Sequence, residues 1–295
     1  MTELITNLIV GAGLGCIYGL IGLSFMGIYN ATGVLNFAQG DFVMIGAVIP
    51  SLFITSFRLP TALAVVIGLA TAVVSALLLQ FTLIEPLLRR NTRIIPMAIG
   101  TFAFSLVIEG AVGGSSTYGT VPAINYVSAL PFKLGSVIIG REYAIIILTT
   151  VVLSAGYWVL LHKTYLGLAL RAIGSNPLGA MSIGIREERV RSLAFVISAL
   201  IAALSGFLVA PLVTAGVTMG FPLLLNGFVA AVVGGMGRAF APLVGGIFLG
   251  ELVSLIGAYG TSAYSDLASL GVLLLVIMVR PDGLLGTVGR GITDS

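Results

Sequence analysis

The sequence predicts an all-α, polytopic integral membrane protein, and its composition and charge distribution carry that prediction. Apolar residues make up 58% of the 295 residues and charged residues only 8%, whereas ordinary soluble domains carry about 25% charged residues. Charges are absent between Glu3 and Asp41 and again between Arg191 and Arg238. Each gap exceeds the roughly 20 apolar residues that span a bilayer. Soluble enzymes, nucleic-acid-binding domains, disulfide scaffolds and disordered chains are therefore excluded.

Charges, prolines and polar clusters divide the chain into candidate membrane segments. We expect about 8–10 transmembrane or re-entrant helices, all within a single transmembrane domain covering residues 1–295. Their apolar runs are continuous rather than alternating, which is typical of helices and not of a membrane barrel. The expected segments are Leu4–Ile28, Phe37–Phe57, Thr61–Ile84, Ile94–Val112, Tyr143–Leu161, Ser192–Thr214, Phe221–Met236, Ala241–Tyr259 and Tyr264–Val279.

The distribution of basic residues predicts the orientation. If these segments alternate sides, one side receives 11 of the 14 Lys and Arg residues, and basic residues gather on the cytoplasmic side. We therefore expect the C-terminus in the cytoplasm and the N-terminus outside. Residues 113–142 then form an outer loop, and residues 162–191 form the one extended cytoplasmic connection. The N-terminus lacks the positive region of a signal peptide, so the first segment should be retained as a helix.

Few residues on this chain have the chemistry of a catalytic or metal site. Cys16 is the sole cysteine and His162 the sole histidine, which excludes a cysteine cluster and an HExxH zinc site. The sequence has no G-x-x-x-x-G-K-[ST] motif that would hold a nucleotide. We expect a protein that is not itself an enzyme and that binds no metal, cofactor or nucleic acid.

The chain contains 39 glycines, and they fall into two patterns. Glycines recur every fourth residue at Gly11, Gly15 and Gly19, and the same spacing separates Gly110 from Gly114 and Gly246 from Gly250; small residues at this spacing let helices pack closely in lipid. The second pattern is a cluster in the middle of an apolar region, which predicts a broken helix. A break at membrane depth is tolerated where it is covered by protein or lines a polar cavity, and such breaks often form transport sites. The residues of this cluster are Gly234, Gly235, Met236 and Gly237.

Polar side chains inside apolar segments are the other candidates for a path. Asn36, Gln39, Gly40 and Asp41 lie together at the start of a segment, and Glu251 lies well inside another. Intramembrane carboxylates are costly and need a reason. Asn36 could instead cap the helix and Asp41 complement its positive end, and Glu251 could be a buried, hydrogen-bonded acid. Structural and path roles both remain open.

The cytoplasmic loop contains a short helix with its own start and stop signals. Ser175 and Asn176 supply capping chemistry, Pro177 suits the first helical position, and Gly184 suits the end. The predicted helix of about two turns is too short to be stable alone, so it needs a surface to lie on. That surface is either the bundle or a partner, which small residues would let approach and apolar residues would contact; these residues are Leu178, Gly179, Ala180, Met181, Ser182 and Ile185.

Four stretches, in order and spacing, resemble the permease subunits of branched-chain amino acid ABC importers, the LivH/LivM family, and the LivH-like subunit most closely. They are LNFAQGDFVMIGA (Leu35–Ala47), RAIGSNPLGAMSIGI (Arg171–Ile185), AAVVGGMGRAFAPLVGGIFLGELV (Ala230–Val253) and RPDGLLG (Arg280–Gly286). The resemblance covers almost the entire chain.

The resemblance implies a multi-pass subunit of the bacterial inner membrane, surrounded by lipid. Its implied partners are a second permease subunit (a homologue or a copy of itself), two cytoplasmic ATPase subunits that bind ATP and Mg, and a periplasmic substrate-binding protein. The short cytoplasmic helix would be the coupling helix that enters a groove of the ATPase. The residues assigned to this coupling are Arg171, Ala172, Ser175, Asn176, Pro177, Ala180, Met181, Gly184 and Ile185.

Two alternatives to import of branched-chain or related hydrophobic amino acids stay open. Many family members have His where Gln39 stands and Glu where Asp41 stands, and related permeases carry urea, short amides or other amino acids. The other alternative is an ion-coupled secondary carrier that uses Asp41 or Glu251 as its cation site.

Overall fold

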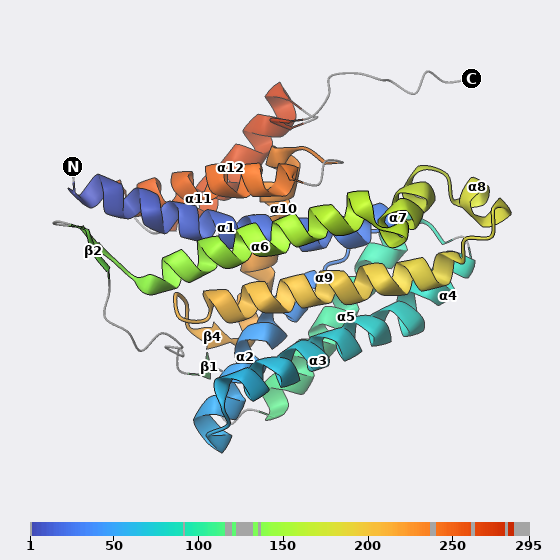
Figure 1. Ribbon diagram of the computed structural model, residues 1–295, viewed down its shortest axis with the longest axis horizontal. Helices are drawn as coiled ribbons and strands as arrows, with labels where there is room; N and C mark the ends of the chain where they lie inside the picture. The colour runs from blue at the N-terminus through green and yellow to red at the C-terminus, as the bar shows by residue number, and fades with distance from the viewer. Residues whose placement is uncertain are drawn as a thin grey trace.

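A computed structural model describes residues 2–90, 92–115, 120–121, 132–134, 137–236, 240–260, 263–280 and 283–285. These residues are mostly helical (Figure 1). The α-helices are α1 Thr2–Thr32, α2 Gln39–Phe57, α3 Thr61–Leu79, α4 Glu85–Arg89, α5 Ile94–Ser115, α6 Arg141–Lys163, α7 Tyr165–Ser175, α8 Pro177–Ser182, α9 Glu187–Val209, α10 Gly220–Gly234, α11 Ala241–Tyr259 and α12 Ala263–Val279. A π-helical turn at Gln80–Ile84 joins α3 to α4, and a 3-10 turn at Val217–Met219 precedes α10.

Length and composition confirm the predicted fold class. Within the described residues, eight helices are long and apolar enough to cross a membrane. They are α1, α2, α3 with its continuation through α4, α5, α6, α9, α10 with the turn before it, and α11. The described part of α12 contributes a shorter apolar helix, Leu267–Val279. The chain is an all-α, multi-pass membrane protein.

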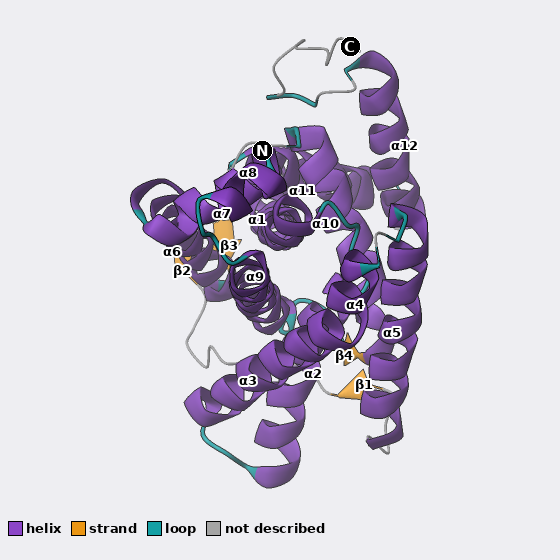
Figure 2. Ribbon diagram, turned by 90° about the vertical axis from the view of Figure 1, so that its right-hand side faces the viewer, coloured by secondary structure: helices purple, strands orange, loops and turns teal. Residues whose placement is uncertain are grey.

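Helix α1 lies at the centre of the arrangement. It packs against α11, α9, α10 and α6, while α2 is enclosed by α9, α3 and α10. Helices α1, α6, α9 and α11 run along the long axis of the molecule, and α10 and α12 cross that direction (Figure 1). Seen from the end, α1 lies among α9, α10 and α11, with α6 at one edge, α5 and α12 at the opposite edge, and α2 and α3 below (Figure 2).

The glycine ladders of α1 and α11 pack closely, as their spacing predicted, and the structure shows that they pack against each other. A Cβ atom on Gly246 would collide with the backbone of Gly15 and Gly19, and one on Gly250 with the backbone of Gly11 and Gly15. The two backbones are therefore in close contact from Gly11 to Gly19, about two helical turns. Such contact is the packing that small residues allow in lipid, where van der Waals fit replaces the hydrophobic drive of water.

The third ladder, Gly110 and Gly114, does not pack against another helix of this chain, so the packing prediction is wrong for it within the subunit. A Cβ atom on Gly110 or Gly114 of α5 would meet no described atom within 4 Å. Helix α5 lies at the edge of the bundle (Figure 2) and exposes large apolar side chains such as Ile95 and Val107. These glycines therefore face outward from the subunit.

The described residues include four short strands between the helices. β1 (Thr120–Val121) pairs antiparallel with β4 (Ala215–Gly216), and β2 (Phe132–Leu134) pairs antiparallel with β3 (Val137–Ile139). The β1–β4 pair joins the loop after α5 to the chain just before α10. Most of the predicted outer loop 113–142 lies outside the described residues.

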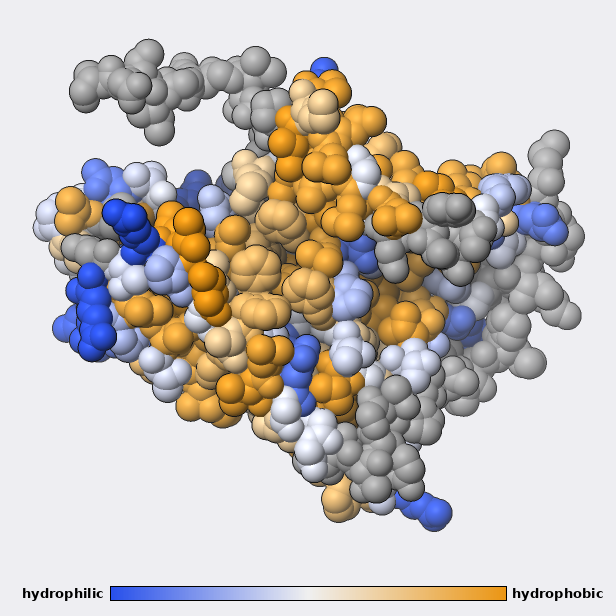
Figure 3. Space-filling model, turned by 180° about the vertical axis from the view of Figure 1, so that it is seen from behind, coloured by the Kyte–Doolittle hydropathy of each residue, from blue (hydrophilic) through white to orange (hydrophobic). Residues whose placement is uncertain are grey.

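The surface divides into an apolar middle and a polar end. Figure 3 shows a broad apolar area across the middle of one face, and hydrophilic residues at the end where α4 and α8 lie in Figure 1. Helix α1 begins at the opposite end and finishes near α7 (Figure 1). We refer to these two ends as the α8 end and the far end.

One helix in the loop 162–191 was not predicted. Helix α7 begins after Thr164, whose Oγ1 accepts a hydrogen bond from the Gly167 N–H over 3.1 Å. Its buried residues Gly167, Leu170 and Ile173 lie on one face, so that α7 rests on the bundle. The cap and this spacing were visible in the sequence and could have identified the helix.

Candidate functional site

The polar cluster at the start of α2 lies deep inside the bundle. Gln39 is fully buried, and its Nε2 donates to Ser24 Oγ at 2.9 Å and to the Ser198 carbonyl oxygen at 3.4 Å. Ser24 lies eight residues before the end of α1, which is about 12 Å along the helix. Helix α2 therefore begins well within the membrane-spanning part of the molecule.

The backbone just before α2 is not helical, and side chains form hydrogen bonds with its polar groups. Asn36 is buried, its Oδ1 accepts from the Ala38 N–H, and its Nδ2 donates to Gln39 Oε1. Thr101 of α5 accepts from the Phe37 N–H and donates to a nearby carbonyl oxygen. Non-helical backbone at membrane depth is tolerated when protein covers it in this way. The cap prediction for Asn36 is wrong, because the residue that precedes α2 is Ala38 and no side chain caps the helix.

Asp41 lies two residues after Gln39 and is 1% exposed. Its carboxyl group interacts with the Ser105 side chain and with the charge of Glu109, both on α5. Its Oδ2 has no hydrogen-bond partner among the described residues. Gly40, between Gln39 and Asp41, lets α2 meet the start of α10, since a Cβ there would lie 2.5 Å from the Gly220 carbonyl oxygen.

The predicted break between α10 and α11 is present. Helix α10 ends at Gly234, and Gly235 has φ 112°, a conformation that favours glycine. Two of the carbonyl groups freed by the break are already occupied, because Leu284 N–H donates to Val233 and Leu285 N–H to Gly234. Met236 is exposed. Gly237 lies outside the described residues.

Glu251 does not join the cluster on α2. It lies on α11, where a Cβ on Gly11 would be 2.8 Å from its Oε2, and this oxygen has no partner among the described residues. Its neighbours are therefore on α1 near the far end. The structure brings together Asn36, Gln39, Gly40 and Asp41, and it places the glycine break and Glu251 elsewhere.

The short helix α8 forms where its signals predicted. Asn176 is the N-cap, with Oδ1 accepting from the Gly179 N–H at 2.9 Å, and Pro177 is the first helical residue. Gly184 has φ 85°, and the N–H groups of Gly184 and Ile185 donate to the carbonyl groups of Met181 and Ala180. This pair of bonds is a Schellman motif, which ends the helix.

The two faces of α8 have different surroundings. Ala180 is 3% exposed and packs with Ile173 and Val190, so the expectation that it offers a partner close approach is wrong. Ile185 also packs against this cluster rather than facing outward. The outward apolar side chains are those of Leu178, Met181 and Ile183, which are 75%, 44% and 75% exposed.

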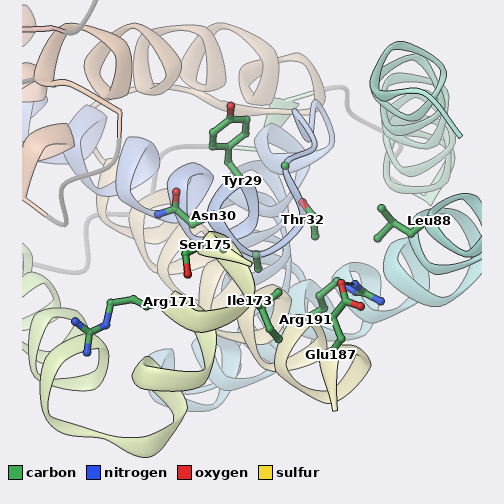
Figure 4. Close-up of a pocket in the computed structure, with 12 residues that line it drawn as sticks. Tyr29, Asn30, Thr32, Leu88, Arg171, Ile173, Ser175, Glu187 and Arg191 are labelled. Atoms are coloured by element: carbon green, nitrogen blue, oxygen red, sulfur yellow. Dashed lines mark hydrogen bonds and ion pairs between the residues drawn. The ribbon is translucent and has the colours of Figure 1, made fainter. Parts of the chain in front are cut away.

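The other residues assigned to coupling lie beside a cavity at the α8 end. Arg171 and Ser175, both exposed, line a cavity of about 610 Å³ between the ends of α1 and α7 and the start of α9. Figure 4 shows Asn30 and Ser175 close together in this cavity and Glu187 beside Arg191 on its wall. Ala172 is half-buried, packed on the cluster that holds Ala180.

A buried polar contact at the α8 end was missed from the sequence. Arg191 donates to Glu85 over 3.1–3.3 Å, with both side chains 7% exposed. One turn away, Gln80 Nε2 donates to Ser192 Oγ at 2.8 Å. We call Gln80, Glu85, Arg191 and Ser192 the polar clamp. Arg191 also pairs with Glu187, four residues before it on the same helix, but Gln80 and Glu85 are over a hundred positions away, and no sequence pattern joins them to α9.

The chain is similar to known proteins over nearly its whole length. The family model "Branched-chain amino acid transport system / permease component" matches residues 7–278. The LivH permease of Escherichia coli is 29% identical, with 94% of this chain and 93% of that protein covered. The probable LivH permease of Methanocaldococcus jannaschii is 29% identical over 90% and 88%, and the BraD permease of Pseudomonas aeruginosa 27% over 95% and 95%.

A solved structure shares the fold. It is PsaBC from Streptococcus pneumoniae in complex with Fab, with a TM-score of 0.51, 13% sequence identity, and coverage of 94% of this chain and 91% of that one. At this identity the likeness concerns the fold alone. Because the family model matches residues 7–278 of the 295, the chain belongs to the family of branched-chain amino acid transport system permease components.

Proposed function

We propose that this chain is a membrane-spanning permease subunit of an ATP-driven importer for branched-chain amino acids. The observation that carries the proposal is the match of the family and of its LivH and BraD members over nearly the full chain. The composition also supports it. The sequence has no motif that would hold a nucleotide, so in an ATP-driven importer a partner would supply the ATP hydrolysis.

Helix α8 is the proposed contact with that partner. It is six residues long, capped at both ends, and it presents Leu178, Met181 and Ile183 outward at the α8 end. Exposed apolar side chains on a polar end of the molecule are typical of an interaction site. We assign this end to the cytoplasm, in agreement with the basic residues there, and two ATPase subunits would bind α8 and its counterpart on a second permease subunit.

The proposed path uses the polar start of α2. Asn36, Gln39 and Asp41 give hydrogen-bonding groups near the middle of the bundle, and a leucine-like zwitterion needs such groups where it loses water. The glycine break at Gly234–Met236 and Glu251 are proposed gate elements. A periplasmic binding protein would deliver the substrate at the far end, and the complex would lie in the cytoplasmic (inner) membrane.

Assembly and ATP hydrolysis test the proposal. The tagged chain is co-expressed with the permease, ATPase and binding-protein genes that adjoin its own, and the complex is purified in detergent and placed in nanodiscs. We expect both ATPase subunits to co-purify, and ATP hydrolysis to rise when binding protein with leucine is added. The proposal would be contradicted if the chain purified without any ATPase, or if the rate of ATP hydrolysis by the complex did not change when binding protein with leucine was added.

A further inference from the structure

The polar clamp connects the segment after α8 to a different membrane helix. Ser192 and Arg191 belong to the first two turns of α9, which begins at Glu187, five residues after α8 ends at Ser182. Gln80 and Glu85 belong to the continuous run of helix from α3 to α4. A displacement of α8 therefore reaches the first turns of α9 through a short connection, and the clamp is the buried polar contact between those turns and the α3–α4 run.

The clamp differs from an ordinary surface ion pair. The Glu85 and Arg191 side chains are each 7% exposed, and three nitrogen–oxygen contacts of 3.1–3.3 Å hold them in a forked arrangement. Gln80 is fully buried beside them. By contrast, the nearby pair of Arg89 with Glu188 has side chains that are 64% and 48% exposed, and exposed pairs contribute little. Desolvated, forked pairs hold two elements in a fixed relative position.

The backbone on one side of the clamp is irregular. A π-helical turn begins at the clamp residue Gln80 and ends at Ile84, just before the clamp residue Glu85. Turns of this kind are rare and frequently mark functional sites within a helix. Beside them lies a cavity of about 640 Å³ lined by Met181, Ile185, Glu85 and Arg191. Space of this size next to the clamp leaves room for α8 and the π-helical turn to move relative to each other.

The α3–α4 run leads back to the polar cluster. A Cβ on Gly68 of α3 would lie 2.7 Å from Pro50 of α2, and α2 carries Gln39 and Asp41 at its start. A continuous set of packed elements thus runs from α8 through the start of α9 and the clamp to α3 and α2. Packed helices of this kind can carry a displacement between distant sites.

We propose that the Glu85–Arg191 pair, supported by Gln80 and Ser192, is a positioning element that transmits motion of α8 to the α3–α4 helix and so couples ATP hydrolysis to opening of the path. This inference rests on the proposed function, because it requires an ATPase at α8. Glu85 and Arg191 touch neither nucleotide nor substrate. Their role is to keep two helices moving together.

The test measures leucine uptake per ATP hydrolysed. The full complex is reconstituted in vesicles for the unmodified chain, for E85Q, R191Q and the double variant, and for E188Q as the control that removes a carboxylate from the exposed pair. In each single variant one charge keeps another partner, because Arg191 also contacts Glu187 and Glu85 also contacts Arg89. The amount of ATPase bound to each complex is measured first.

We expect E85Q and R191Q to bind ATPase normally and to hydrolyse ATP within about threefold of the unmodified complex, while uptake per ATP falls about tenfold or more. The double variant should be no worse than either single one, because both remove the same connection. R191K, which keeps the charge without the fork, should recover part of the loss. E188Q should stay within about twofold of the unmodified ratio.

Two outcomes would overturn the inference. One is uptake per ATP within twofold of the unmodified ratio for E85Q and R191Q. The other is a loss of uptake in strict proportion to lost assembly, which is a folding role only. If the charge-removing variants fail to assemble, uptake per ATP is measured for S192A and R191K instead. A value equal to that of the unmodified complex in both variants would contradict coupling. Failure of the proposed function is separate, since the unmodified complex would then show no ATP-dependent uptake.

Discussion

At the scale of single residues, glycine has two distinct settings in this chain. Gly15, Gly246 and Gly250 let α1 and α11 touch backbone to backbone, so no larger residue fits there without moving a helix. Gly110 has the same spacing pattern in the sequence but meets open space. The four-residue repeat predicted which glycines share a helix face. It could not predict which face is covered, because that depends on the partner helix.

We therefore expect opposite effects from the same substitution in the two settings. G250A should force α1 and α11 apart and cost on the order of 1–3 kcal/mol, the usual range for overpacking. G110A places a methyl group in open space and should stabilise the helix by about 0.5–1 kcal/mol, because alanine restricts the unfolded chain more than glycine does. Thermal unfolding of the purified chain in one detergent measures both, and equal melting temperatures would contradict the packing of α1 on α11.

At the scale of elements, prediction succeeded where local signals act alone. Helix α11 begins and ends at the residues expected from the sequence, and α8 begins at its predicted proline. The predicted segment Thr61–Ile84 does not end at Ile84 but continues as helix through α4. The charge of Glu85, which marked the predicted end, is buried in an ion pair with Arg191. Which face of α8 is buried also depends on tertiary packing. The sequence-based expectation that Ala180 faces a partner was wrong, because Ala180 is buried against the chain's own helices.

The two faces of α8 predict two kinds of failure. L178D adds a charge to an exposed side chain, so the permease should fold normally and lose ATPase binding by about tenfold or more, as expected when a charge enters an apolar contact. A180D places a charge in a buried cluster and should lower the yield of folded chain itself. Size-exclusion chromatography of the chain alone and co-purification with the ATPase separate the effects. Normal ATPase binding by L178D would contradict docking through α8.

At the scale of the whole molecule, the fold class followed from composition, while the function needed the arrangement. Charge distribution identified a membrane bundle, and the polar stretch around Gln39 was a visible candidate. The sequence could not show that this stretch lies inside the bundle between Ser24 and Ser198, since these contacts come from two other helices and Ser198 is 159 positions from Gln39. Depth in the bundle is a property of topology. We propose that the bundle so arranged is a conduit that a partner powers.

Uptake by reconstituted vesicles tests that central claim most directly. Vesicles that contain the chain alone, with proton or sodium gradients imposed, are compared with vesicles that contain the chain, its permease partner, the ATPases and added binding protein. We predict that only the complete complex accumulates radiolabelled leucine, and only with ATP inside the compartment that the α8 end faces. Accumulation by the chain alone under an ion gradient would contradict the claim and assign the transport to Asp41 or Glu251 as a cation site.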